Sequence, residues 1–72
     1  NRRSPKFEDA DRLRKNKQFA KAIPLFADLW KTEPSPYVGW RYASCLRKAN
    51  QPDQAVEIMR QARSQYPNDK YT

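Results

Sequence analysis

The clearest pattern in this chain is a set of apolar residues that recur three and four positions apart. One stripe consists of Phe19, Ala22, Ile23, Phe26, Leu29 and Trp30. A second stripe consists of Ala55, Val56, Met59 and Ala62. Such spacing places apolar side chains on one face of an α-helix, whereas a half-buried strand would alternate apolar and polar residues. The pattern therefore predicts an all-α fold.

Capping residues and prolines divide the pattern into four helices. Ser4 and Ser35 each precede a proline, which is the order of an N-cap and a first helical residue. Helices are predicted from Pro5 to about Asn16, from Phe19 to Glu33-Pro34, from Pro36 to the turn at Asn50-Gln51, and from Pro52 to Tyr66-Pro67. Pro24 lies inside the second helix, where we expect a bend and not a break.

A displacement of 33 residues maps the first half of the chain onto the second. The triplet Leu-Arg-Lys occurs at both Leu13 and Leu46, for example. The other matched pairs are Phe7 with Trp40, Ala10 with Ala43, Ala22 with Ala55, Ile23 with Val56, Phe26 with Met59 and Pro34 with Pro67. Two antiparallel helix pairs are therefore expected. The predicted divisions are a basic tail at 1–4, a first unit at 5–34, a second unit at 35–67, and the start of a missing third unit or capping helix at 68–72.

Two helices per unit of this length, small alanines at helix contacts and a terminal proline resemble the tetratricopeptide repeat, and the resemblance covers residues 5 to 67. The family usually has glycine in the turn between its helices, where this chain has Lys17 and Asn50. The fold implied is a fragment of an α-solenoid with two repeats.

The resemblance also implies a groove lined by the first helix of each unit, in which the family holds peptides. The positions that would face it are Ser4, Phe7, Asp11, Arg14, Lys15, Tyr37, Trp40, Ser44, Arg47 and Lys48. Arg41 joins them because it lies among aromatic residues, a mixture typical of protein contact sites. The partner-binding residues predicted are Phe7, Arg14, Lys15, Tyr37, Trp40, Arg41, Ser44, Arg47 and Lys48.

The net charge of the chain indicates the chemical class of its partner but does not identify the partner. Fifteen basic and eight acidic residues give a net charge of +7, which favours acidic partners. The first hypothesis is a protein-interaction scaffold, within a larger protein or assembly, that binds an acidic or amphipathic peptide. The alternative is an accessory nucleic-acid-binding module that uses the same aromatic and basic residues. Self-association through an uncapped last helix is a third possibility.

Composition argues against catalysis and cofactor binding. The chain has no histidine, one cysteine and one glycine, so the commonest general base, a thiolate metal site and a phosphate-binding glycine loop are not expected. We predict no enzyme activity, no cofactor and no metal. A lone cysteine cannot form an internal disulfide, which favours a reducing, cytoplasmic location. No apolar stretch reaches the length of about 20 residues that a membrane span needs.

Overall fold

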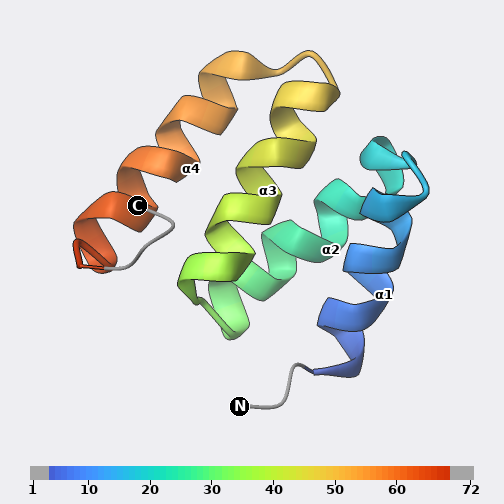
Figure 1. Ribbon diagram of the computed structural model, residues 1–72, viewed down its shortest axis with the longest axis horizontal. Helices are drawn as coiled ribbons and strands as arrows, with labels where there is room; N and C mark the ends of the chain where they lie inside the picture. Colours follow the sequence, from blue (N-terminus) through green and yellow to red (C-terminus); the bar gives the residue numbers. More distant parts are fainter. Residues whose placement is uncertain (1–3, 69–72) are drawn as a thin grey trace.

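The computed structural model of the chain describes residues 4–68, and these form four α-helices with no strand among them (Figure 1). The helices are α1 (Pro5–Lys15), α2 (Phe19–Thr32), α3 (Pro36–Lys48) and α4 (Pro52–Gln65). The all-α prediction is confirmed, and each helix begins and ends within about two residues of its expected place, which is the usual uncertainty of a helix boundary.

Serine caps fix the start of the first helix of each pair. The Ser4 hydroxyl accepts a hydrogen bond from the Phe7 amide at 3.2 Å, and the Ser35 hydroxyl accepts one from the Val38 amide at 3.3 Å. Each bond satisfies an amide that has no partner within the helix. A proline follows each cap, where its missing N–H costs nothing. The two N-caps predicted from the sequence are thus confirmed.

The two Leu-Arg-Lys triplets form the last turns of α1 and α3. After α1, the amides of Lys17 and Gln18 donate to the carbonyls of Arg14 and Leu13, which is the bond pattern of a Schellman motif. After α3, Asn50 and Gln51 donate in the same way to Arg47 and Leu46. Lys17 and Asn50, which stand where the family usually has glycine, have φ of 63° and 65°, the left-handed conformation that glycine adopts without strain. The repeated triplet is therefore a helix ending.

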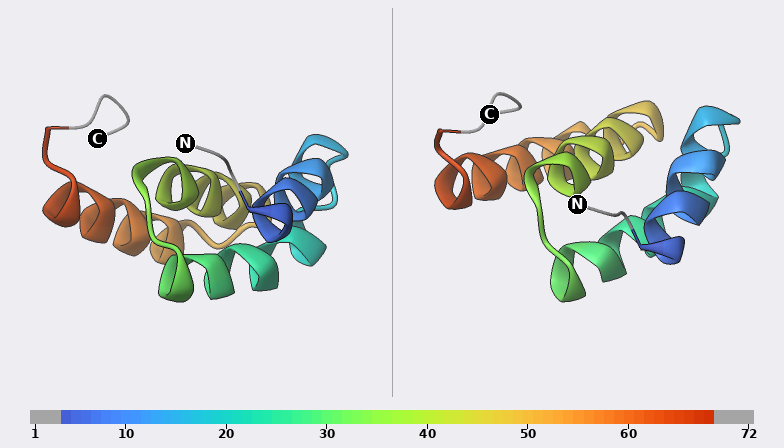
Figure 2. Two further views of the ribbon diagram at one scale, coloured as in Figure 1. Left: turned by 90° about the horizontal axis from the view of Figure 1, so that it is seen from below. Right: turned by 60° about the horizontal axis from the view of Figure 1, so that its bottom comes forward.

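The helices pack as two antiparallel pairs, with α1 against α2 and α3 against α4. α3 also packs against α2 and touches α1, which joins the pairs. Figure 2 (left) shows α1 and α3 in one layer and α2 and α4 in the other. The buried apolar residues are Phe7, Ala10, Ala22, Phe26, Leu29, Val38, Ala43, Cys45, Leu46, Ala55, Ile58 and Ala62. Their alanines lie at helix contacts, where a small side chain lets helix axes approach.

Two local features shape how the pairs meet. α2 runs through Pro24 without a break, which confirms that part of the prediction, and the bend stays a prediction. Gly39, in α3, lies so close to Trp30 of α2 that a Cβ atom built there would be 2.9 Å from the indole ring. The same indole N–H donates to the Gln61 side chain of α4 at 2.8 Å. Trp30 thus joins three helices across the two pairs.

Two predicted divisions lie almost entirely outside the described residues. Only Ser4 of the tail at 1–4 and only Asn68 of the segment at 68–72 are described.

Candidate functional site

The residues predicted to bind a partner fall into two groups in the structure. Phe7, Arg14, Lys15, Tyr37 and Arg41 lie along the contact between α1 and α3. Trp40, Ser44 and Arg47 instead line a groove between α3 and α4. Lys48 is exposed at the end of α3. The two groups differ in how far their side chains are already engaged within the chain.

Phe7 is a core residue, in contrast to its predicted place in a partner-binding groove. Its ring is 1% exposed and makes edge-to-face contacts with Phe26 and Tyr37, at centroid distances of 6.0 and 5.0 Å. The Arg41 guanidinium lies over the same ring, 5.6 Å from its centroid, within the range of a cation–π interaction. Phe7 is therefore covered by α3, and we leave it out of the candidate site.

The basic side chains at the contact between α1 and α3 lie around Asp11. Its side chain is buried, and its carboxylate accepts a hydrogen bond from Arg14 Nε at 2.8 Å. Arg41 Nε lies 3.2 Å from the same oxygen, at an angle that makes it an ion pair and not a hydrogen bond. Lys15 Nζ lies 3.5 Å from the second oxygen. One buried carboxylate thus interacts with three of the predicted contact residues.

Opposing effects act on the pKa of Asp11. Burial alone would raise the pKa of this carboxyl, because it disfavours the charged form. The hydrogen bond from Arg14 and the positive charges of Arg14, Arg41 and Lys15 outweigh burial, so that the pKa lies below its ordinary value of 3.8. Asp11 is consequently ionised at neutral pH. The negative charge of Asp11 therefore compensates part of the positive charge of Arg14, Lys15 and Arg41. These three residues were predicted to contact a partner.

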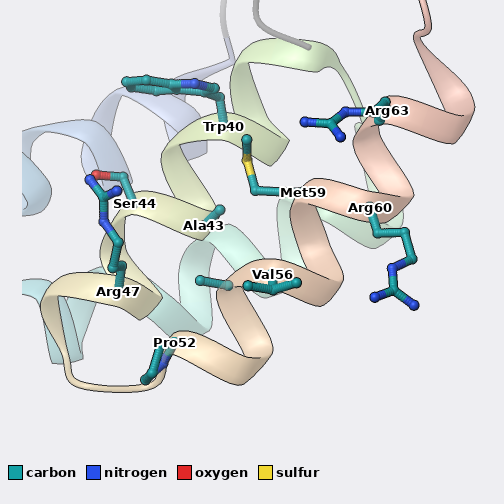
Figure 3. A pocket seen from close by; sticks show the side chains of 10 residues that line it. Trp40, Ala43, Ser44, Arg47, Pro52, Val56, Met59, Arg60 and Arg63 are labelled. Atoms are coloured by element: carbon teal, nitrogen blue, oxygen red, sulfur yellow. The ribbon is translucent and has the colours of Figure 1, made fainter.

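A groove lies between α3 and α4 (Figure 3). It has a volume of about 530 Å³ and is lined by Trp40, Ala43, Ser44, Arg47, Pro52, Ala55, Val56, Met59, Arg60 and Arg63. Trp40 is 43% exposed and Val56 57%, and they are the large apolar side chains that stand out most from the surface of the described residues. Exposed apolar residues that share one concave surface are typical of binding sites.

Arginines flank the groove. In Figure 3, Arg47 lies near one end of the apolar surface, Arg63 extends toward Trp40 and Met59, and Arg60 points away. The lining contains no carboxylate. Among residues 4–68, no acidic side chain forms a salt bridge with any of these three arginines. The groove therefore combines an apolar floor with positive charge that no carboxylate among residues 4–68 compensates.

Sequence reasoning identified only one wall of this groove. Trp40, Ser44 and Arg47 of α3 are among the predicted contact residues, whereas the α4 side and its start at Pro52 are not. A signal for the second wall was present, because Val56 and Met59 are the 33-residue counterparts of Ile23 and Phe26. Repetition, however, shows only that such residues pack against something. An uncapped last helix was expected, but that expectation did not identify Val56 and Met59 as the wall of a groove shared with Trp40.

The described residues offer little reactive chemistry. Burial raises the pKa of the Cys45 thiol to about 11, with Arg14 opposing the shift and Asp11 adding to it, so that the thiolate nucleophile is scarce at neutral pH. Within residues 4–68, no three side chains of His, Cys, Asp or Glu are grouped as a metal site would require. None of the four helices is long and apolar enough to cross a membrane.

The family model described as tetratricopeptide repeat matches residues 13–71, a stretch that includes α2, α3, α4 and both walls of the groove. No curated protein and no solved structure matches the sequence significantly.

Proposed function

Because the chain belongs to the tetratricopeptide repeat family, we propose that it is a protein-interaction module that binds an acidic, amphipathic segment of a partner protein between α3 and α4. The family supports a role in protein–protein interaction in general. The chemistry of the segment comes from the groove itself. Its apolar floor favours a partner with an apolar face, and its arginines favour carboxylates beside that face.

The observation that carries this proposal is that exposed apolar side chains share the groove with arginines that form no salt bridge with any described carboxylate. Trp40 and Val56 lie in the same groove as Arg47 and Arg63. Near α1, in contrast, Asp11 already engages the arginines and α3 covers Phe7. Tryptophan and arginine are the residues that most often contribute strongly to protein binding. Of the predicted contact residues, those of the groove are thus the best placed to meet a partner.

The proposal is tested by fluorescence anisotropy with a labelled peptide of the length of α3, built from leucine and glutamate at helical spacing. We expect saturable binding near physiological ionic strength. The double variant Arg47→Glu, Arg63→Glu should weaken binding at least about tenfold, which corresponds to 1.4 kcal/mol. A matched control is Lys21→Glu, Lys31→Glu, because both lysines are exposed on α2 and the net charge changes equally. The control should change the affinity by less than about twofold, since neither lysine lines the groove and salt screens exposed charges that make no direct contact.

Two results would contradict the proposal. One is tight binding of single-stranded RNA that the Arg47→Glu, Arg63→Glu variant abolishes, with the peptide left unbound. Nucleic acid would then be the partner, and the affinity should fall steeply with salt, by a log–log slope of about 0.7 for each neutralised phosphate. The other is concentration-dependent dimerisation in sedimentation that the same variant disrupts, because a second copy would then occupy the groove. Circular dichroism of each variant establishes that it is folded.

A further inference from the structure

The first pair of helices, α1 and α2, has a surface equivalent to the groove between α3 and α4, and a helix already packs on it. A displacement of 33 residues maps the floor of the groove, Trp40, Ala43, Ala55 and Met59, onto Phe7, Ala10, Ala22 and Phe26. The latter four are buried in one cluster with Val38 and Cys45, both of α3. α3 is therefore the occupant of the corresponding surface in the first pair.

The two pairs are built alike, so the comparison between them is a structural one. α2 and α4 each have 14 residues, and the turns that precede them have the same bond pattern and a left-handed residue at Lys17 and Asn50. On this surface the two pairs differ in exposure, and α3 covers it in the first pair. Phe7 is 1% exposed beneath α3, while its counterpart Trp40 is 43% exposed. The groove thus has the form of a surface that accepts an α-helix.

Charge distinguishes the two surfaces. In the first pair, Asp11 receives Arg14 from its own helix and Arg41 from α3. In the second pair Arg47 replaces Arg14, but Ser44 stands where Asp11 would be. Within the part of the chain that the structure describes, Arg47 therefore has no carboxylate partner like the one that Asp11 gives to Arg14. An occupant with an arginine at the place of Arg41 would meet only another arginine, and like charges repel.

From these observations we infer that the partner segment binds as an amphipathic α-helix, placed as α3 is placed on α1 and α2, with a carboxylate where α3 has Arg41. The inference rests on the proposed function and adds to it the conformation of the segment and the position of its charge. α3 presents Val38, Tyr42 and Cys45 to the first pair. The partner helix accordingly carries apolar residues at positions i, i+4 and i+7 and Asp or Glu at i+3, beside Arg47.

The test uses labelled peptides derived from residues 35–48, because α3 is the one helix known to fit such a surface. All carry Trp40→Gln and Leu46→Gln, which remove apolar residues that α3 turns toward α4, and Cys45→Ala. The Glu peptide adds Arg41→Glu. The displaced peptide adds Arg41→Ser and Ser44→Glu, so that composition and charge are unchanged while the carboxylate moves off the docking face. The Pro peptide is the Glu peptide with Ala43→Pro, which prevents a continuous helix.

We expect the complete chain to bind the Glu peptide at least about tenfold more tightly than the displaced or the Pro peptide, a difference of 1.4 kcal/mol or more. The Arg47→Glu variant of the chain should lose that preference and bind the Glu and displaced peptides about equally. Circular dichroism should show that the helical signal of the Glu peptide increases on binding. This increase is specific to a helical complex, and an extended peptide would not produce it.

Other outcomes overturn the inference, and they can be told apart from a failure of the proposed function. Equal affinity for the Glu and Pro peptides would mean that the segment binds without forming a helix. Equal affinity for the Glu and displaced peptides would mean that Arg47 does not select the position of the carboxylate. In both cases the leucine–glutamate peptide would still bind, and the proposed function would stand. If that peptide also fails to bind the folded chain, the proposed function falls with the inference.

Discussion

Asp11 shows how one residue can redirect the chemistry of its neighbours. A carboxylate at this position, 3% exposed, is stable only because Arg14, Lys15 and Arg41 surround it. Arg41 belongs to α3, so the ion pair also ties the two helix pairs together. Residues that the sequence assigns to partner binding are here part of the internal structure.

We predict that Asp11→Asn lowers the free energy of unfolding by about 1–3 kcal/mol at neutral pH, because it removes the charge that compensates the arginines. The pKa of Asp11 is lowered in the folded chain, so its contribution is present above the unfolded pKa of about 3.9 and is lost as the pH falls through the lowered value. Urea titrations from neutral pH to about pH 2.5 should therefore show the variant and the original chain converging in acid.

The control for Asp11 is Glu57→Gln, which removes one negative charge from an exposed position in α4. It should change the unfolding free energy by less than about 0.5 kcal/mol. An Asp11→Asn variant as stable as this control at neutral pH would show that the ion pairs of Asp11 do not hold α1 and α3 together.

Lys17 adopts a backbone conformation that costs free energy in the folded chain. Its φ of 63° brings Cβ close to the carbonyl oxygen, at a cost of about 1–2 kcal/mol for most residues. Lys17→Gly should therefore raise the free energy of unfolding by about 0.5–1 kcal/mol, after subtracting the cost of the larger conformational entropy that glycine gives the unfolded chain. Asn50→Gly, at the equivalent turn, should gain less, since asparagine tolerates this conformation. Thermal denaturation of the two variants measures the difference, and equal gains would contradict this account.

At the scale of the elements, α2 is unusual because it continues through Pro24. Proline has no N–H to donate to the carbonyl of Ala20, and in a helix interior it costs about 3 kcal/mol. Pro24 is exposed, so its replacement loses little packing. Pro24→Ala should stabilise the chain by about 1–3 kcal/mol in urea denaturation.

Pro52 provides a matched comparison, because it is also exposed but stands first in α4. There its fixed φ suits the helix and the missing N–H has no intrahelical acceptor. Pro52→Ala should give no gain in stability. If both alanine variants stabilise the chain equally, the position of Pro24 within α2 is not what makes it costly.

The approach of α3 to α2 depends on Gly39. A Cβ atom there would lie 2.9 Å from the Trp30 ring and 3.2 Å from Ala62 Cβ. Gly39→Ala should therefore destabilise the chain by about 1–3 kcal/mol, although alanine favours a helix by about 1 kcal/mol. Combining it with Trp30→Phe, which shortens the ring, should recover part of the loss in a double-mutant cycle. Strict additivity of the two changes would mean that the indole does not oppose a larger side chain at position 39.

At the scale of the whole molecule, one face of α4 packs in the core and another lines the groove. Ile58 is in the core, while Val56, two residues away, is 57% exposed in the groove. Ile58→Ala should cost about 2–4 kcal/mol of stability. Val56→Gln should change stability by less than about 0.5 kcal/mol and still weaken binding of the acidic peptides. Urea denaturation and peptide anisotropy on both variants measure this separation, and a Val56→Gln variant with unchanged affinity would remove α4 from the site.

The sequence predicted the elements better than the site, for a reason visible at single residues. The caps at Ser4 and Ser35 and the turns that contain Lys17 and Asn50 depend on bonds within a few residues, so local patterns indicate where they lie. The burial of Phe7 depends on Tyr37 and Arg41 of another helix. Position within a repeat could not distinguish Phe7 from Trp40.

The sequence by itself determined four helices in two similar pairs, their boundaries, and an excess of positive charge. Periodicity and capping depend on residues a few positions apart, and net charge is a sum over the chain, so none of these requires knowledge of which helices meet. Only the tertiary structure decided which of two equivalent surfaces is covered. α3 packs over Phe7 and brings Arg41 to Asp11, and it thereby closes one surface. Among the described residues, no helix does the same for Trp40, Val56 and Arg47. Burial depends on neighbours brought together by folding, and this is why the open groove between α3 and α4 emerged only from the structure.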